Sequence, residues 1–309
     1  MSKIAFIFPG QGAQYVGMAK DFYEAYPIVR ETFEEASKIL SFDFTHLILE
    51  GPESELILTK NSQPAIFIVS VAILRCIQQL YPHLQPSVCA GLSLGEYTAL
   101  YASGRISFAD ALQIVAARGK YMQEACQEEP STMKVVLGLD PQIVAANLPP
   151  NVWIANLNCP GQVVIAGATS AMPQAEEKLK AEGAKRVLPL DVSGAFHTPL
   201  MRSAQEKLKS SLLSVTLNES STQLVMNVPG DFVDSISQIR EHLIAQVASP
   251  TQWEKGIRLL EDVELYIEIG PGKTLSGMNK KIGVKGQTLN IEKTTDLVQL
   301  ENFYATSQR

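Results

Sequence analysis

The hydrophobic pattern of the first third of the chain alternates short apolar runs with longer segments of helical periodicity. Residues Ile4 to Phe8 form a continuous apolar run that stops at Pro9, which predicts a short buried strand. Similar patterns predict a second strand over 87–90 and helices over 63–80, 94–102 and 107–127. Strands separated by helices are typical of a parallel sheet that helices cover on both faces.

The middle of the chain has a different rhythm. Strands and helices are predicted there in the order β-α-β-β-α-β, over 133–139, 141–148, 152–157, 162–166, 170–182 and 185–191. That order is the ferredoxin-like pattern. The α/β signals resume after it, at 224–227, 236–247 and 265–269. We therefore predict a large α/β domain of residues 1–128 and 195–309, interrupted by an inserted ferredoxin-like α+β domain of residues 129–194.

Composition excludes several classes of protein. Of the 309 residues, 46% are hydrophobic and 19% are charged, which is enough apolar material for a large buried core. The net charge of −6 argues against nucleic acid or an anionic membrane as a general partner. The longest apolar run, 65–74, is far shorter than the roughly 20 residues of a membrane span, and the N-terminus lacks the apolar segment of a signal peptide. We expect a cytoplasmic protein.

The sequence lacks complete motifs for binding a dinucleotide, a nucleotide phosphate or a metal ion. After the first strand, the third glycine of a dinucleotide-binding fingerprint would fall on Tyr15. Near the C-terminus, the early glycine of a phosphate-binding loop that ends at Lys273 would fall on Ile267. The cysteines have neither disulfide-scaffold nor zinc-site spacing; they are Cys76, Cys89, Cys126 and Cys159. We expect no metal and no resident cofactor.

A G-x-S-x-G motif, Gly91-Leu-Ser93-Leu-Gly95, follows the second predicted strand and opens a helix. This setting is that of a nucleophile elbow, a sharp turn that exposes the serine above the N-terminus of the helix. Ser93 is therefore a candidate nucleophile. An ordinary strand-to-helix turn with a helix-capping serine is the alternative.

The loop Pro9-Gly-Gln-Gly12 lies at the end of the first predicted strand. Its glycines would let backbone N–H groups approach a reacting oxygen closely. Together with the N–H of Leu94, directly after the candidate nucleophile, this loop could complete an oxyanion hole. A plain tight turn explains the loop equally well.

Of the four histidines, His197 is the best candidate for a general base. It follows the last strand of the inserted unit and precedes Thr198 and Pro199, a typical start of a helix. It is therefore expected at the carboxyl end of a strand, where α/β proteins assemble their sites. A buried structural histidine is the alternative.

Arg118 lies on the apolar face of the helix predicted over 107–127. A buried guanidinium is unfavourable without an anionic partner. That anion is either a structural carboxylate or the carboxylate of a substrate, and the helical pattern alone does not choose between them.

Together these motifs resemble the malonyl-CoA:acyl carrier protein transacylases of fatty acid synthesis. The resemblance covers about residues 3–290, in the order of the family. The motifs that carry it are Pro9-Gly-Gln-Gly12, Gly91-Leu-Ser-Leu-Gly-Glu-Tyr97, Ala117-Arg-Gly-Lys120, Gly161-Gln-Val-Val-Ile-Ala-Gly167, Gly194-Ala-Phe-His197, Pro250-Thr-Gln-Trp253 and Gly270-Pro-Gly-Lys273.

The resemblance implies an α/β-hydrolase-like large domain with a ferredoxin-like insertion. It implies Ser93 as the acylated nucleophile and His197 as its base. The backbone amides of Gln11 and Leu94 would form the oxyanion hole. The resemblance also assigns substrate binding to Arg118 and Gln252. Arg118 would hold the malonyl carboxylate, and Gln252 would lie by the site with its backbone carbonyl orienting His197.

The resemblance also implies the reaction, a ping-pong transfer of malonyl from malonyl-CoA to the phosphopantetheine thiol of acyl carrier protein through a malonyl-serine. The family does not require an acid beside the histidine, and the pattern had selected none from Asp110, Asp140 and Asp191. We expect a monomer. A serine hydrolase, a non-catalytic binding module and a transferase of a larger acyl group are the competing functions.

Two further features bear on the partners. Leu92 stands where the family commonly has histidine, a departure that concerns the polarity of the pocket. An acidic carrier protein would need a local basic surface. Two candidate groups are present: Lys273, Lys280, Lys281 and Lys285, and Lys178, Lys180, Lys185 and Arg186. Ordinary solvated lysines are the alternative for both groups.

Overall fold

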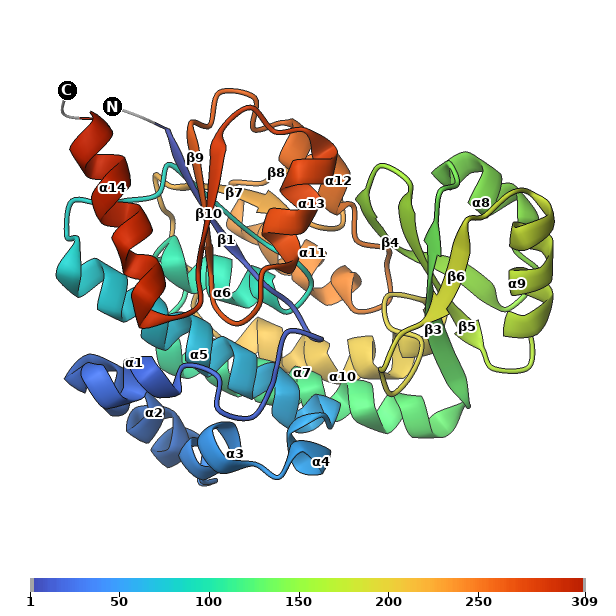
Figure 1. The fold of residues 1–309 in the computed structure, drawn as a ribbon. Helices are drawn as coiled ribbons and strands as arrows, with labels where there is room; N and C mark the ends of the chain where they lie inside the picture. The colour runs from blue at the N-terminus through green and yellow to red at the C-terminus, as the bar shows by residue number, and fades with distance from the viewer. Residues whose placement is uncertain (1–2, 308–309) are drawn as a thin grey trace.

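A computed structural model describes residues 3–307, with side chains up to residue 303, and shows two units side by side (Figure 1). The larger unit is built on a six-stranded sheet in the order β10-β9-β1-β2-β7-β8. Its first five strands in that order pair in parallel, and β8 pairs antiparallel at one edge. Their bounds are β1 Ile4–Phe8, β2 Val88–Gly91, β7 Gln223–Met226, β8 Asp231–Phe232, β9 Leu265–Ile269 and β10 Gln287–Ile291.

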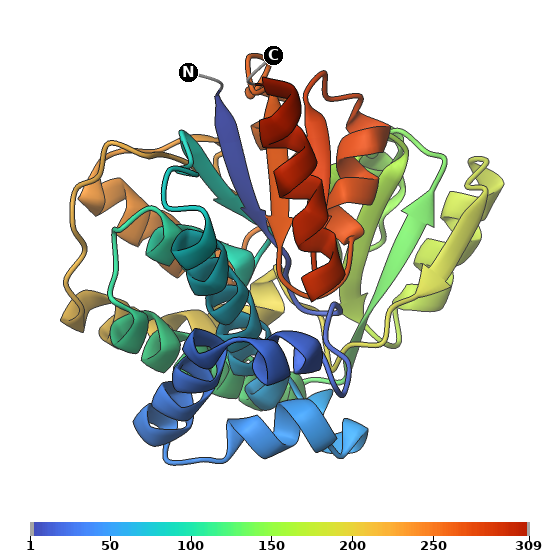
Figure 2. The ribbon, with the colours of Figure 1, turned by 60° about the vertical axis from the view of Figure 1, so that its left-hand side comes forward.

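Helices cover both faces of this sheet. Successive residues of β1 point to opposite faces, so they pack against different helices. Phe6 and Phe8 pack into the core that includes α5 and α7, whereas Ala5 and Ile7 pack against α12 and α13. Figure 2 shows α1 to α4 grouped at the bottom of the view, next to α5. The helices are α1 Lys20–Ala25, α2 Pro27–Leu40, α3 Phe44–Glu50, α4 Glu53–Leu56, α5 Thr59–Leu80, α6 Gly95–Ala102, α7 Phe108–Glu128, α10 Arg202–Ser214, α11 Ile236–Gln246, α12 Trp253–Arg258, α13 Thr274–Ile282 and α14 Leu297–Ser307.

Helix α5 is the central helix of the large unit. By length and composition it could cross a membrane, and it is the one helix among residues 3–307 that could. However, 78% of its most apolar segment is buried inside the fold. Its apolar surface is therefore used in packing against α2 and α7.

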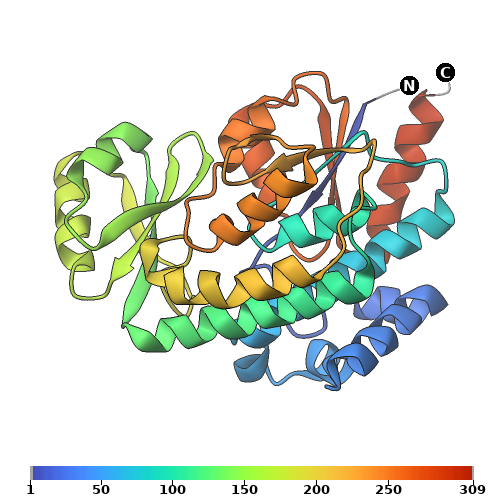
Figure 3. The same ribbon diagram turned by 180° about the vertical axis from the view of Figure 1, so that it is seen from behind.

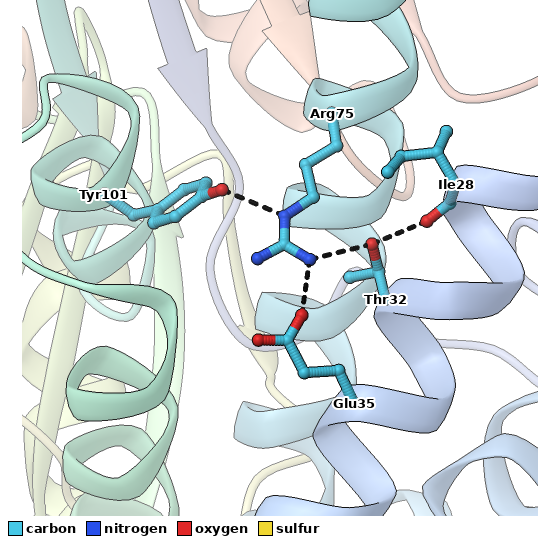
Figure 4. Close-up of polar contacts among 5 residues, drawn as sticks. All are labelled: Ile28, Thr32, Glu35, Arg75 and Tyr101. Carbon is cyan, nitrogen blue, oxygen red and sulfur yellow. Dashed lines mark hydrogen bonds and ion pairs between the residues drawn. The ribbon is translucent and has the colours of Figure 1, made fainter.

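One polar cluster links three helices of this layer (Figure 4). Arg75 on α5 donates to the Glu35 carboxylate at 2.7 Å and to the Thr32 hydroxyl at 3.2 Å, both on α2. Its Nε donates to the Tyr101 hydroxyl on α6 at 2.9 Å. The guanidinium also lies over the Phe108 ring, 4.4 Å from its centre. The hydrogen bonds hold α2 and α6 to α5, and the ring contact adds the start of α7.

The smaller unit is a four-stranded antiparallel sheet in the order β4-β5-β3-β6, which is the ferredoxin-like topology. Helices α8 and α9 cover its outer face, far from the large unit in Figure 1. Residues 129–194, predicted as the insertion, contain all six elements: β3 Ser131–Leu137, α8 Pro141–Asn147, β4 Val152–Cys159, β5 Gln162–Ala168, α9 Met172–Ala181 and β6 Arg186–Pro189.

The two units are joined by the chain itself and by hydrogen bonds. Helix α7 leads directly into β3 and lies beside α10 along the back of the molecule (Figure 3). Strand β4 is held to the segment before α12, since Thr251 donates to the Ala155 carbonyl and accepts from the Leu157 N–H, both at 2.9 Å. A cleft between the units remains open at the carboxyl ends of β1 and β2.

Candidate active site

A cavity of about 270 Å³ occupies this cleft. The loop after β1 and residues Ser93 and His197 form its wall on the large unit. Strands β4 and β5 supply amide side chains from the opposite wall, and α13 supplies apolar ones. These wall residues are Asn156, Asn158, Gln162, Leu275 and Met278.

Ser93 has the backbone geometry of a nucleophile elbow. Its φ is 54°, in the left-handed region that L-residues rarely adopt. The flanking glycines are required, because a Cβ on Gly91 would lie 1.9 Å from the Gly95 carbonyl carbon and one on Gly95 would lie 2.2 Å from the Phe8 oxygen. The Ser93 N–H donates to the Asn227 side-chain oxygen at 2.7 Å. The ordinary-turn alternative does not explain this strained, fixed serine.

His197 lies directly against the serine. Its Nε2 is 2.7 Å from Ser93 Oγ, and its Nδ1 is 2.8 Å from the Gln246 carbonyl oxygen. Because a carbonyl only accepts, Nδ1 carries the proton and Nε2 is free to accept the serine proton. The predicted serine–histidine contact is therefore present.

The predicted role of the Gln252 carbonyl is wrong. The carbonyl that orients His197 belongs to Gln246, at the end of α11. The Gln252 side chain instead donates to the Val228 carbonyl at 2.7 Å, and its N–H donates to the Asn227 carbonyl at 2.9 Å. Gln252 directly precedes α12, after the turn through Ser249 and Pro250, so the chain has already moved past the imidazole.

Burial makes His197 a neutral base. The side chain is 3% exposed, and desolvation, with the nearby positive charge of Arg118, lowers its pKa to about 4. Hydrogen bonds to the Gln246 and Ser249 backbones act in the opposite direction and do not compensate. At neutral pH the imidazole is therefore unprotonated and able to take a proton.

The predicted oxyanion-hole amides lie near Ser93. Gln11 lines the cavity, and Leu94 directly precedes α6. Within residues 3–307, neither N–H donates to a protein acceptor. The two loops approach closely here, since a Cβ on Gly10 would lie 2.5 Å from the Leu92 oxygen. Both amides are therefore available, and their joint use remains a prediction.

Arg118 is buried beside the nucleophile, at 1% exposure. It donates to Ser93 Oγ at 3.0 Å, to Gln63 Oε1 at 2.6 Å and to Gln246 Oε1 at 2.7 Å. Desolvation by burial lowers its pKa. All three direct partners are neutral, so the guanidinium lacks a directly bonded carboxylate among the described residues. This arrangement favours the substrate-carboxylate alternative.

Several site residues were missed by the sequence analysis. Glu96, on α6, is 1% exposed and accepts hydrogen bonds from Asn227 and Gln246. Gln63 on α5 is fully buried and holds Arg118. Glu96 was visible as an acidic residue directly after the elbow motif, whereas nothing in the local pattern marked Asn227 or Gln246.

The other candidates lie elsewhere. His46 and His83 are exposed, and His242 is half-buried. Asp110 lies in the first turn of α7 and accepts from the hydroxyl of Ser107, the N-cap, and Asp140 is the N-cap of α8, so neither serves as an acid beside His197. Among the described residues, no group of three or more His, Cys, Asp or Glu side chains could hold a metal ion.

Comparison with known proteins identifies relatives along almost the whole chain. Residues 5–284 match the acyl transferase domain family. The malonyl CoA-acyl carrier protein transacylase of Bacillus subtilis (strain 168) is 42% identical over 302 residues, which cover 94% of each chain. The enzyme of the same name from Escherichia coli (strain K12) is 44% identical over 289 residues, 91% of this chain and 93% of that one.

Solved structures agree with the fold. A malonyl-transacylase in complex with its type II PKS acyl-carrier protein superposes with a TM-score of 0.93 at 39% identity, covering 97% of this chain and all of that one. The MCAT from Streptococcus pneumoniae superposes with a TM-score of 0.91 at 42% identity, over 96% and 99% of the two chains. The α/β architecture predicted from the sequence is confirmed.

Proposed function

The chain belongs to the acyl transferase domain family, and we propose that its Ser93 carries a malonyl group from malonyl-CoA to the thiol of an acyl carrier protein. This is the reaction named for the relatives from Bacillus subtilis and Escherichia coli. It supplies malonyl units for fatty acid elongation. The observation that carries the assignment is the 2.7 Å contact between Ser93 Oγ and His197 Nε2, beside a buried arginine.

In the first half-reaction, Ser93 Oγ attacks the thioester carbonyl carbon while His197 Nε2 takes the hydroxyl proton. The negative charge that develops on the carbonyl oxygen is stabilised by the N–H groups of Gln11 and Leu94. The tetrahedral intermediate then collapses, the carbon–sulfur bond breaks, and His197 returns its proton to the leaving thiolate of CoA.

In the second half-reaction, His197 takes the proton of the phosphopantetheine thiol on the carrier protein. The thiolate attacks the malonyl ester of Ser93, and the serine leaves with the proton from the imidazole. The donor thioester and the acceptor thiol are both carried on a phosphopantetheine arm, so one cavity can bind each in turn. Two half-reactions at one serine imply ping-pong kinetics.

Arg118 supplies selectivity for a carboxylate-bearing acyl group. Its guanidinium donates directly to the nucleophilic oxygen at 3.0 Å, so it lies beside the position of an acyl group on Ser93, and it has no directly bonded carboxylate among the described residues. A planar guanidinium can bind the malonyl carboxylate through two parallel hydrogen bonds. Leu92, where a histidine is common in the family, adds an apolar side chain to the cavity wall.

The acidic carrier protein would dock beside the mouth of the cleft. Helix α13 contributes Thr274, Leu275 and Met278 to the cavity wall. Four exposed lysines lie on this helix or directly beside it, and we name them the α13 lysines: Lys273, Lys280, Lys281 and Lys285. The second group lies on α9 and β6, and its Lys180 is already paired with Glu176. Position and free charge favour the α13 lysines as the docking surface.

We also propose that the protein acts as a monomer in the cytoplasm without a resident cofactor. All the groups that contact Ser93 and His197 come from one chain, so the site is complete without a second copy. CoA enters as part of the substrate. Sedimentation of the pure protein tests the oligomeric state.

Intact-mass measurement after mixing with malonyl-CoA tests the function. A covalent acyl-enzyme predicts an adduct of about 86 Da on Ser93, and its transfer to holo carrier protein should remove it. The Ser93→Ala variant should form no adduct. Steady release of free malonate without carrier protein would instead indicate a serine hydrolase, and an absent adduct would indicate a binding module. A panel of larger acyl-CoAs tests for a different acyl group.

A further inference from the structure

Glu96 is a buried carboxylate that the reaction described above does not use. It follows the elbow motif directly and is 1% exposed. Its Oε1 accepts from the backbone N–H of Asn227, and its Oε2 accepts from the side-chain amide of Gln246. Both partners are donors, so the geometry matches the ionised carboxylate, which only accepts.

Gln246 connects this carboxylate to the catalytic groups. Its Nε2 also donates to the Ser93 carbonyl at 2.8 Å, and its Oε1 accepts from Arg118 at 2.7 Å. Its backbone carbonyl accepts from His197 Nδ1 at 2.8 Å. One residue therefore contacts the nucleophile's turn, the base and the buried arginine.

The second partner of Glu96 supports the same turn. The Asn227 side chain accepts from the Ser93 N–H and donates to the Gly91 carbonyl, both at 2.7 Å. The backbone of Asn227 is in turn bonded to Glu96. The carboxylate thus holds, through the backbone of Asn227 and the side chain of Gln246, both residues whose side chains fix the strained backbone at Ser93.

We propose that Glu96 is a positioning residue for acyl transfer. Its carboxylate sets the direction of the Gln246 amide: with Nε2 held by Glu96, the amide oxygen must face Arg118. Reversal of that amide would place an N–H group against the guanidinium. This inference rests on the proposed function and adds to it an acid that acts on the serine–histidine pair only through amides.

The surroundings of Glu96 make its charge sensitive to pH. The charged or titratable groups that face it are Arg118 on α7 and Tyr97 on its own helix. The other groups that face it are the backbone amide of Asn227, directly after β7, and the side-chain amide of Gln246 on α11. Burial raises the Glu96 pKa to about 7, against the hydrogen bonds and the Arg118 charge that favour ionisation. A protonated Glu96 carries an O–H on one of the two oxygens that accept from Asn227 and Gln246. The positioning of Gln246 and of the Ser93 turn should therefore weaken below that pH.

The test is the rate of Ser93 acylation by malonyl-CoA between pH 5 and 9, in the full-length protein. We expect the wild-type rate to rise about tenfold as the pH increases through 7, because protonation of Glu96 below that pH removes a charged hydrogen bond. Glu96→Gln should lose this step and be about 10- to 100-fold slower above pH 8. Glu96→Asp, which keeps the charge, should recover part of the step.

Glu268→Gln is the matched control. Glu268 is also a fully buried carboxylate and accepts from two backbone N–H groups, of Leu275 and Ser276, but it has no recorded contact with the Ser93–His197 pair. It should keep the wild-type pH profile. If Glu96→Gln does not fold, Gln246→Leu tests the same connection and should also lose the step near pH 7.

Three outcomes are distinguishable. Loss of the step in Glu96→Gln or Gln246→Leu, with the step kept in Glu268→Gln, supports the proposal. Equal slowing at every pH, or no slowing, in a folded Glu96→Gln protein would overturn it and leave Glu96 a structural residue. Failure of the wild-type protein to form the malonyl adduct would overturn the proposed function instead.

Discussion

The imidazole of His197 donates from Nδ1 to the backbone carbonyl of Gln246, 2.8 Å away, and in this way keeps Nε2 directed at Ser93. In many serine enzymes a carboxylate occupies the position of that carbonyl. Here the partner is neutral, so it orients the imidazole without a full negative charge. The nearest buried acid, Glu96, contacts the Gln246 side chain instead.

The first prediction concerns pH. His197 must be neutral to accept the serine proton, and its pKa is lowered to about 4. Acylation should therefore survive well below pH 6.5, where an ordinary histidine protonates, and its final loss should occur as the pH falls toward about 4. The measurement is the acylation rate of Glu96→Gln, in which the Glu96 step is removed. A final loss centred near pH 6.5 would contradict a buried neutral base.

The second prediction concerns Arg118. Replacing it with alanine should slow malonyl transfer far more than acetyl transfer, by about 2–5 kcal/mol in the ratio of their rates, because a buried charge pair is lost. Competing acyl-CoAs with one enzyme sample give that ratio. Arg105→Lys is the control, since Arg105 is equally buried but donates to the Thr222 and Ser220 carbonyls. Equal losses for both acyl groups would make Arg118 structural.

The third prediction separates two glutamines. Gln252→Ala should leave the acylation rate within about twofold and reduce the free energy of unfolding by about 1 kcal/mol, as expected for one lost hydrogen bond. Gln246→Ala should slow acylation by at least about tenfold, because Arg118 and the elbow each lose a contact. Single-turnover kinetics and urea unfolding measure both quantities. The reverse ranking of the two rates would restore Gln252 to the site.

The fourth prediction concerns carrier-protein docking. Changing Lys273, Lys280 and Lys285 together to glutamate should slow transfer to the carrier protein at least about tenfold and abolish its salt dependence. Acylation by malonyl-pantetheine, which lacks the charged nucleotide, should not change. The comparison protein carries Lys178→Glu and Lys185→Glu. If that protein shows the loss instead, docking occurs on α9 and β6.

The fifth prediction concerns backbone geometry. Gly91→Ala should prevent folding of the elbow or destabilise the protein severely, because its Cβ would overlap the Gly95 carbonyl carbon. Gly277→Ala lies within α13 with no atom within 4 Å of the added Cβ, and should stabilise the protein by up to about 1 kcal/mol. Thermal unfolding checks both. Similar midpoints for the two variants would contradict a close-packed elbow.

The sequence predicted the elements better than their contacts. The apolar run predicts the strand Ile4–Phe8 with its observed bounds, because a continuous apolar run between polar segments leaves little choice. The strand Gln287–Ile291 was missed, since only Leu289 and Ile291 in it are buried and its other residues are polar or half-buried. An edge strand needs little apolar sequence, so periodicity alone does not reveal it.

Local sequence also predicts those features of the site that depend on residues close together in the chain. The glycines around Ser93 encode the turn, and the position of Arg118 on an apolar helix face encodes its burial. What no local pattern contained was the pairing of His197 with a carbonyl 49 residues away, or of Glu96 with an amide 150 residues away. The resemblance pointed to Gln252 for that carbonyl, whereas the structure uses Gln246. Only the packing of α11 against the elbow decided between them, because a backbone carbonyl carries no side-chain signal in the sequence and acts only where the fold directs it.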